Sequence, residues 1–310
     1  MTLTEFRYIV AVARERHFGR AAAACHVSQP TLSVAVRKLE DELGVTLFER
    51  GHPEIAVTPT GERVMEQARR VLAETDTLRR IADQAQDPLQ GPLRIGAIYT
   101  IGPYLFPHLI PILHEQAPRM PLIVEENYTG RLGEQLRRGE LDAIVVALPF
   151  EQAGVETVAL YDEPFRAVAP MGHPWDVRDA ISPQELGAEN VLLLGPGHCF
   201  RDQVLTACPD CAGAALEGAG PDRRVEGSSL ETIRYMVASG MGVTVLPCTA
   251  VDRERHTGRL VSVRPFMDPA PRRRVALAWR RSFPRPEAIA TLRAGIRQCG
   301  LDCVEYVDAA

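Results

Sequence analysis

Apolar residues recur at helical spacing through most of the first 45 positions. Thr2 and Glu5 have the spacing of a capping box, so a first helix should begin there and end near His17. Its apolar stripe consists of Leu3, Phe6, Ile9, Val10 and Ala13. A short alanine-rich helix over 18–25 and a turn at 26–27 follow.

A third helix is predicted from Ser28 to Gly44. Ser28 is a good N-cap, Pro30 falls in the first turn, and Gly44 suits the C-terminal end. The core spacing is carried by Leu32, Val36, Leu39 and Leu43. Two helices joined by so short a turn have the helix-turn-helix shape.

The remaining face of this third helix carries short polar groups and cations, namely Gln29, Thr31, Ser33, Arg37 and Lys38. Such groups near an exposed helix start can contact base edges and phosphates. The segment LFERGHPEIAVTPTG then predicts two short strands around a turn, a wing with Arg50 available for a phosphate. Residues 1–58 are therefore predicted to be a winged helix-turn-helix domain for double-stranded DNA. A helical hairpin that merely packs is the alternative.

Residues 59–90 predict one long helix. Thr58 can cap it, Pro59 would be its first residue, and it should run to Asp87, about 45 Å at 1.5 Å per residue. Apolar and small residues alternate four and three apart at Val64, Ala68, Val71, Thr75, Leu78, Ala82 and Ala85. This seam favours pairing of two chains, and packing on its own chain is the alternative.

From residue 91 the pattern changes to apolar runs alternating with helical stretches. The runs are LRIGAI, PLIVEEN, LDAIVVAL, FRAVAP, NVLLLG, VTVLP, RLVSV and RRVALAW. Helices are predicted over 105–116, 132–138 and 286–300. Such alternation indicates an α/β domain with a parallel or mixed sheet.

Composition is ordinary for a globular protein, with 45% apolar and 24% charged residues among 310. The net charge of −5 gives no sign of a nucleic-acid partner, so that prediction depends on pattern alone. Among the 35 basic residues only Lys38 is a lysine. The chain has neither an apolar run of 18 residues nor a signal-peptide pattern, so we expect a cytoplasmic protein without membrane contact.

Seven scattered cysteines do not resemble a secreted disulfide framework, and in a reducing compartment each should start as a thiol. The segment GHCFRDQVLTAC is chemically the most informative. A helix starting at Cys199 would place its sulfur near unpaired backbone N–H groups, with His198 and Arg201 as nearby donors or cations. This setting favours the thiolate, which attacks peroxide, and Cys208 is the natural resolving partner.

Helix geometry makes this pair a switch. Nine helical steps put the Cα atoms of Cys199 and Cys208 about 13 Å apart on opposite faces, whereas a disulfide tolerates at most about 7 Å. Oxidation would therefore have to unfold the helix or release its anchoring. The alternative is a pair of inert, buried thiols.

The N-terminal sixty residues resemble LysR-type regulators. The matching residues are AAAACHVSQPTLSVAVRKLEDELGVTLFER followed by VTPTG. The resemblance implies a two-subdomain α/β effector region over 91–310, of the fold shared with periplasmic binding proteins. Subdomain I would cover about 91–165 and 266–310, and subdomain II about 166–265.

The segment GHCFRDQVLTAC resembles the OxyR-type peroxide sensors of that family. The resemblance implies that Cys199 is the peroxidatic and Cys208 the resolving cysteine. It also implies polar partners for peroxide at Thr100, Thr129, His198, Asp202 and Arg273. From sequence alone the two threonines are equally well turn or cap residues, and Arg272 could replace Arg273.

Cys211 departs from this pattern because it makes a C-x-x-C motif with Cys208. The resolving role could be shared, or a second disulfide could form. With Cys299 and Cys303 the same two cysteines imitate zinc-ligand spacing, although a closed site of four thiolates would hold Cys208 away from the redox chemistry. Cys25 and Cys248 are expected to be structural. We therefore expect neither metal nor cofactor.

The leading hypothesis is a DNA-binding transcription factor, not an enzyme, that senses hydrogen peroxide. The family resemblance adds homodimers or homotetramers, a thiol reductant for resetting, and RNA polymerase as a partner. The alternatives are a regulator that binds a small anion or aromatic acid in the cleft of the effector region, and a thiol peroxidase.

Overall fold

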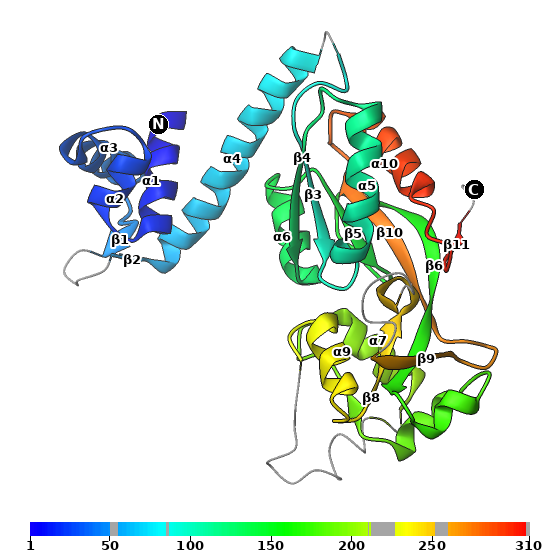
Figure 1. The fold of residues 1–310 in the computed structure, drawn as a ribbon. Coiled ribbons are helices and arrows are strands. Elements are labelled where there is room, and N and C mark those ends of the chain that lie inside the picture. Colours follow the sequence, from blue (N-terminus) through cyan, green and yellow to red (C-terminus); the bar gives the residue numbers. More distant parts are fainter. Residues whose placement is uncertain (50–54, 85–86, 210, 212–226, 252–259, 308–310) are drawn as a thin grey trace. The chain divides into compact units, whose positions relative to one another are not determined.

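The computed structural model describes residues 1–49, 55–84, 87–209, 211, 227–251 and 260–307. Side chains are described over the same ranges except for 79–84. The chain divides into two compact units, Met1–Asp87 and most of the remainder, which are described separately (Figure 1). In the described ranges, no helix is both long and apolar enough to cross a membrane.

The first unit begins with three helices, α1 (Leu3–Glu15), α2 (Phe18–Ala24) and α3 (Gln29–Leu43). The predicted capping box is present, because the Thr2 hydroxyl accepts from the Glu5 N–H and the Glu5 carboxylate accepts from the Thr2 N–H. Ser28 accepts the Thr31 N–H at 3.3 Å, and Gly44 ends α3 with φ +65°. The cap residues therefore act as the sequence predicts.

The wing consists of β1 (Phe48–Glu49) and β2 (Ala56–Val57), which pair antiparallel. Helix α4 (Pro59–Gln84) follows, and the Thr58 hydroxyl accepts its Gly61 N–H at 2.9 Å. The described helix ends at Gln84, three residues before the predicted end. Ala68 is buried in the core of the first unit, whereas Leu78 is 67% exposed. Among the described seam residues, the start of the seam therefore packs on its own chain and Leu78 does not.

The second unit contains one nine-stranded mixed sheet. Its main path runs β4 (Leu122–Asn127), β3 (Leu93–Ile98), β5 (Ala143–Ala147), β10 (Arg272–Arg280), β6 (Val155–Pro170), β8 (Val243–Pro247) and β7 (Val191–Leu192). Two further strands, β9 (Val261–Pro265) and β11 (Glu305–Tyr306), pair with β6. The β3–β4, β3–β5 and β7–β8 pairs are parallel and the others antiparallel. The predicted α/β class is thus confirmed.

Strand β6 belongs to two ladders. Its residues 155–164 pair with β10, whereas residues 165–170 pair with β8 and β9. The hydrogen-bonding partner changes between Pro164 and Phe165, and each ladder carries its own apolar core. These two parts are called subdomains I and II below.

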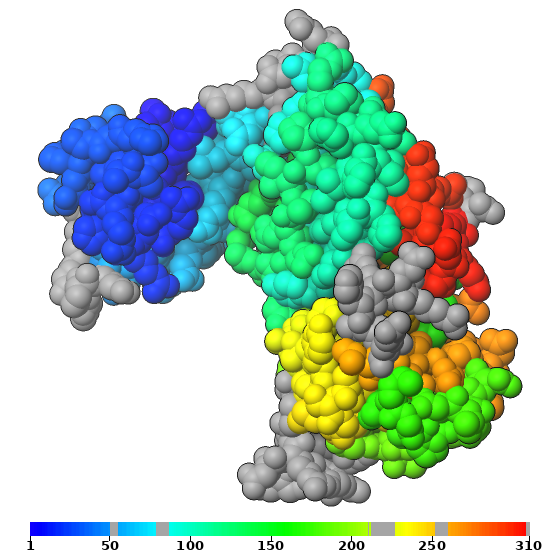
Figure 2. Space-filling view, in the orientation of Figure 1, coloured from blue at the N-terminus to red at the C-terminus, as the bar shows by residue number. Residues whose placement is uncertain are grey.

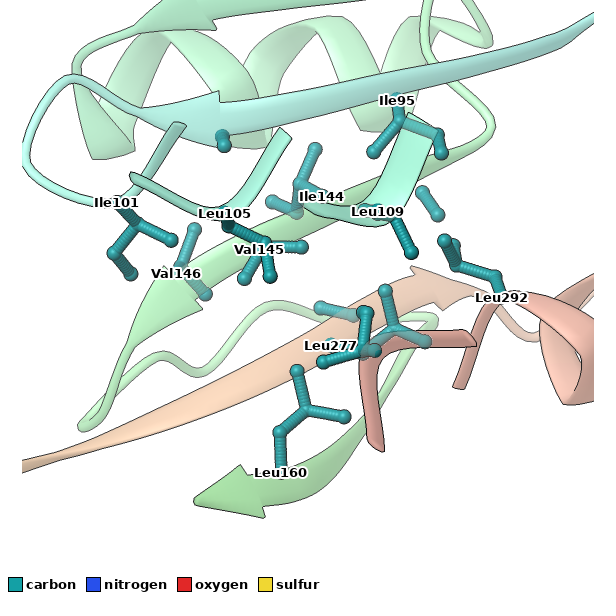
Figure 3. Close-up of a cluster of buried hydrophobic side chains, with 14 of the residues drawn as sticks. Ile95, Ile101, Leu105, Leu109, Ile144, Val145, Val146, Leu160, Leu277 and Leu292 are labelled. Atoms are coloured by element: carbon teal, nitrogen blue, oxygen red, sulfur yellow. The ribbon is translucent and has the colours of Figure 1, made fainter. Parts of the chain in front are cut away.

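Subdomain I packs α5 (Gly102–Gln116), α6 (Thr129–Arg138) and α10 (Pro286–Gln298) on its sheet. Figure 3 shows Ile101, Leu105 and Leu109, at the start of α5 and along it, pointing toward Val145 and Val146 of β5. Leu277 of β10 and Leu292 of α10 complete this core. The side chains of α10 lie directly against those of α5 (Figure 2, red on green).

Subdomain II contains α7 (Cys199–Ala207), α9 (Leu230–Ala238) and three short 3-10 helices, η1 (Pro174–Val177), η2 (Pro183–Ala188) and η3 (Cys248–Val251). Its core includes Phe165 of β6, Phe200 of α7 and Ile233 of α9. Helix α9, strand β11 and the first half of β6 were not among the predicted elements, and α5 begins three residues before its predicted start.

Candidate functional site

Helix α7 begins at Cys199, as the sequence predicts. His198 is the N-cap by its backbone, at φ −83° and ψ 115°, without a side-chain cap hydrogen bond. Gly197 enters the turn at φ +95°, where a side chain would be strained and its Cβ would touch the Tyr128 ring at 3.4 Å. The half-buried Cys199 therefore occupies the first helical turn, beside N–H groups without helical partners.

The two faces of α7 pack into different cores. Phe200, Val204 and Cys208, four residues apart, all belong to the core of subdomain II. Cys199 instead packs against the core of subdomain I and is a free thiol. With α7 intact the Cα atoms of Cys199 and Cys208 are about 13 Å apart from helical rise. The geometry therefore separates the two sulfurs that the sequence pairs.

His198 lies in an aromatic cluster with two tyrosines from the ends of parallel strands. Its ring centroid is 5.9 Å from that of Tyr99, which follows β3, and 4.8 Å from that of Tyr128, which follows β4. The two tyrosine rings meet edge to face at 5.3 Å. Burial lowers the pKa of His198, so the neutral imidazole is favoured near neutral pH. Of the two predicted roles, donor or cation, this environment favours the neutral donor.

Arg273 sits at the centre of a buried polar network. Its Nε lies 2.7 Å from Glu163 Oε2, its Nη1 donates to Thr100 Oγ1 at 2.7 Å, and its Nη2 donates to the Thr100 carbonyl at 2.8 Å. Its guanidinium carbon also lies 5.1 Å from the Phe200 ring centroid. Arg272, the alternative candidate, instead pairs with exposed Glu305 at 2.9 Å. Arg273 is thus the arginine that contacts Thr100.

The two threonine hydroxyls are both buried but differ in their partners. Thr100 Oγ1 accepts from Arg273, which leaves its own hydrogen available for another acceptor. Thr129 begins α6, and within the described residues its buried Oγ1 has no hydrogen-bond partner. A buried hydroxyl left unpaired costs about 1–3 kcal/mol, so a bound polar ligand would be stabilised there.

Asp202 and Arg201 lie on the outer side of α7. Asp202 is exposed in the first turn, where a carboxylate interacts favourably with the helix dipole, and its carbonyl accepts from Thr206 Oγ1 at 2.8 Å. The Arg201 Nη1 donates to the Leu194 carbonyl at 2.7 Å.

The other cysteines do not gather into a metal site. Cys208 and Cys211 form a disulfide with Cα atoms 5.4 Å apart, and Cys248 and Cys303 form another, 6.0 Å apart. Cys299 is buried, and this burial raises its pKa to about 11. Three of the four cysteines with zinc-ligand spacing are therefore in disulfides, and the described residues contain no cluster of metal-ligating side chains.

In the first unit, α3 exposes most of the residues expected to contact DNA. Gln29, Thr31, Arg37 and Lys38 are exposed and Ser33 is half-buried. The Lys38 Nζ lies 3.8 Å from Glu5. Val34 of the same helix is 68% exposed, and Arg50 lies outside the described residues.

Sequence reasoning missed several residues of both sites. Glu163 lies on the same face of β6 as buried Tyr161 and Phe165, and this period of two was a signal for an inward-facing carboxylate. Tyr99 and Tyr128 directly precede the two threonines, and only the fold brings their rings to His198. Val34 lies off the apolar stripe of α3, and this position was a signal that its side chain is exposed.

Two family models match the chain, the lysR-family bacterial regulatory helix-turn-helix protein over residues 3–62 and the LysR substrate binding domain over residues 86–299. The chain is 42% identical over 297 residues to the DNA-binding transcriptional dual regulator OxyR of Escherichia coli K12, covering 96% of this chain and 95% of the relative. It is 41% identical over 302 residues to a probable hydrogen peroxide-inducible genes activator of Streptomyces viridosporus, covering 97% and 95%.

Solved structures of OxyR proteins are also similar to this chain. Full-length OxyR of Pseudomonas aeruginosa with a cysteine-to-aspartate substitution is 53% identical, with a TM-score of 0.80 over 100% of this chain and 99% of that one. A hydrogen peroxide-bound cysteine-to-serine mutant of OxyR from Corynebacterium glutamicum is 32% identical, with a TM-score of 0.64 over 97% and 93%.

Proposed function

Since this chain belongs to the LysR family of bacterial transcriptional regulators, we propose that it controls transcription in response to hydrogen peroxide, as a sensor of the OxyR type. The observation that carries the proposal is the position of Cys199. It is a free thiol at the start of α7, and its sulfur packs on one subdomain core while its resolving partner Cys208 packs in the other.

The first chemical step is attack of the Cys199 thiolate on a peroxide oxygen. The O–O bond breaks, the sulfur is oxidised to sulfenic acid, and hydroxide departs and takes up a proton. Hydroxide is a poor leaving group, so donors that stabilise it are needed. We assign this role to the free hydrogen of Thr100, to Thr129 and to neutral His198, with Arg273 fixing the orientation of Thr100. Exposed Asp202 would relay from solvent the proton that the departing hydroxide takes up.

The second step requires Cys208 as a thiol, not in its disulfide with Cys211, and joins Cys199 to Cys208 with release of water. The distance of about 13 Å exceeds the disulfide limit of about 7 Å, so α7 must unfold and withdraw Phe200 and Val204 from the core. Exposing each such side chain costs about 1.5–3 kcal/mol. These costs oppose the disulfide, so α7 is expected to refold once the bond is reduced.

The first unit supplies the DNA contacts in this proposal. Exposed Gln29 and Thr31 would contact base edges, Ser33 would support them, and Arg37, Lys38 and the wing residue Arg50 would bind phosphates. The exposed part of the α4 seam, including Leu78, would pair two chains, so that two reading helices meet successive half-sites.

The proposed cellular setting is the cytoplasm, where a thiol reductant resets the disulfide and RNA polymerase reads out the change. We propose a dimer that assembles further into a tetramer. The protein is a regulator and not an enzyme in this proposal, because one oxidation per molecule suffices for a signal.

The test compares DNase footprints of the reduced protein before and after one equivalent of peroxide. The unsubstituted protein and a Cys299→Ser control should change their footprints, and Cys199→Ser should not. A normal response by Cys199→Ser would refute the proposal. Ligand-dependent thermal stabilisation of Cys199→Ser by small anions would instead favour a cleft effector, and sustained peroxide turnover with a thiol reductant would favour a peroxidase.

A further inference from the structure

The end of α7 carries a second redox pair. Cys208 is the C-cap of α7, and its disulfide to Cys211 closes only three residues further along the chain. Both cysteines are buried in the core of subdomain II, at 2% and 0% exposure. With this disulfide present, α7 is folded over its full length and Cys199 is a free thiol.

We propose that Cys211 is a second resolving cysteine. It forms a disulfide with Cys208, which breaks the bond between Cys208 and Cys199 and returns Cys199 to its reduced form. The inference rests on the proposed function, because it requires a Cys199–Cys208 disulfide to form first. It assigns a chemical step to a residue that the peroxide reaction itself does not need.

The step is a thiol–disulfide exchange in which atoms and electrons balance. The Cys211 thiolate attacks Cys208 Sγ, the bond between Cys208 and Cys199 breaks, and the Cys208–Cys211 bond forms. Cys199 leaves as a thiolate, and the proton lost by Cys211 passes to Cys199 or to solvent. No outside oxidant or reductant is consumed. Overall, one peroxide has oxidised Cys208 and Cys211, and Cys199 has been regenerated.

Helix geometry gives the exchange its direction. A Cys199–Cys208 bond cannot coexist with folded α7, whereas the Cys208–Cys211 bond spans Cα atoms 5.4 Å apart with the helix intact. Exchange therefore lets Phe200 and Val204 return to the core of subdomain II. The resulting disulfide is buried, so it is shielded from a soluble reductant. The conformational signal would thus end before the protein is fully reduced.

The sequence provides a direct assay. Arg201 lies between Cys199 and Cys208, and no further lysine or arginine occurs before Arg223. Trypsin thus yields one peptide with Cys199 and another with both Cys208 and Cys211. A Cys199–Cys208 bond links two peptides, whereas a Cys208–Cys211 bond stays within one. The fully reduced, full-length protein would receive one equivalent of hydrogen peroxide, with samples acid-quenched, alkylated and analysed by mass spectrometry over time.

In the unsubstituted protein and in a Cys25→Ser control, the linked peptides should appear first and then give way to the internal disulfide, with alkylatable Cys199 returning. In Cys211→Ser the linked form should persist at least about tenfold longer, because a thiol three residues away attacks at an effective concentration of millimolar or above. Cys199→Ser should form the internal disulfide far more slowly under the same treatment.

Three results would overturn the inference. If the linked peptides accumulate equally in the unsubstituted protein and in Cys211→Ser, Cys211 has no resolving role while the proposed function stands. If the linked peptides form in neither protein, the proposed function fails and the relay fails with it. Equally fast formation of the internal disulfide in Cys199→Ser would mean that peroxide oxidises this pair directly.

Discussion

The equilibrium between folded α7 and the Cys199–Cys208 disulfide should respond to the helix propensity of a single exposed residue. Thr206 is exposed in the last turn of α7, where its hydroxyl donates to the Asp202 carbonyl. Thr206→Ala and Thr206→Gly both remove this bond, so a comparison of the two variants isolates backbone propensity. Both are made in a Cys211→Ser background, in which exchange to Cys211 is blocked.

Alanine stabilises a helix interior by about 0.8–1.0 kcal/mol relative to glycine. Thr206 is the penultimate residue of α7, so we take about 0.5–1 kcal/mol as the effective difference. A difference of 1.4 kcal/mol changes an equilibrium constant tenfold, so this range corresponds to a factor of about two to five. The glycine variant should be the more easily oxidised, because its α7 costs less to unfold.

The assay is a redox titration in dithiothreitol mixtures, with the Cys199–Cys208 disulfide quantified from the linked tryptic peptides. Ala294→Gly is the matched control, since Ala294 is exposed in α10, which the proposed switch leaves folded. It should leave the equilibrium constant unchanged. Equal constants for Thr206→Ala and Thr206→Gly would refute the coupling between the disulfide and α7, as would an equal shift in the control.

Three further predictions concern stability. Glu163→Gln should lower the free energy of unfolding in urea by about 3–5 kcal/mol, because Arg273 stays buried without its counter-charge. A protein with both Glu163→Gln and Arg273→Met should lose less unfolding free energy than the sum of the two single losses. Strictly additive losses would contradict this account. Cys303→Ser should lower the free energy of unfolding by about 4 kcal/mol under oxidising conditions, because its bond to Cys248 closes a loop of 55 residues. In the presence of a reductant the substitution should change nothing. An equal loss in both conditions would mean that packing, and not the disulfide, causes it. Burial lowers the pKa of His198, so below about pH 6.5 the unfolded state binds more protons than the folded state and stability falls as pH falls. His198→Asn should flatten the slope of unfolding free energy against pH between pH 7 and 5. An unchanged slope would exclude a contribution of His198 to the pH dependence.

Local signals made much of the fold predictable from sequence. The capping box at Thr2, the N-cap at Ser28 and the left-handed Gly44 each act within a few residues, so their positions can be read directly. The same holds for the start of α7 after Gly197, where a turn residue precedes a helical stretch. The α/β alternation likewise predicts class, because buried parallel strands leave continuous apolar runs.

The interior of the site was less predictable, because its contacts are long-range. Arg273 meets Glu163 and Thr100 across separations of 110 and 173 residues, which no local pattern encodes. The stretch 155–164 contains Asp162, Glu163 and Pro164 and therefore resembles a loop, although it forms half of β6. Tertiary pairing with β10 overrides this weak strand propensity. The Cys208–Cys211 disulfide was one of two alternatives that the C-x-x-C spacing left open.

The double membership of β6 has a mechanical consequence. One uninterrupted strand is hydrogen-bonded in both ladders, so the subdomains cannot slide past each other without breaking backbone hydrogen bonds. The motion that preserves these bonds is a twist of the strand near Pro164 and Phe165. Glu163 lies one residue from that pivot and is tied to Arg273. Unwinding of α7 that twists this strand would therefore act next to the carboxylate that holds Arg273 against Thr100.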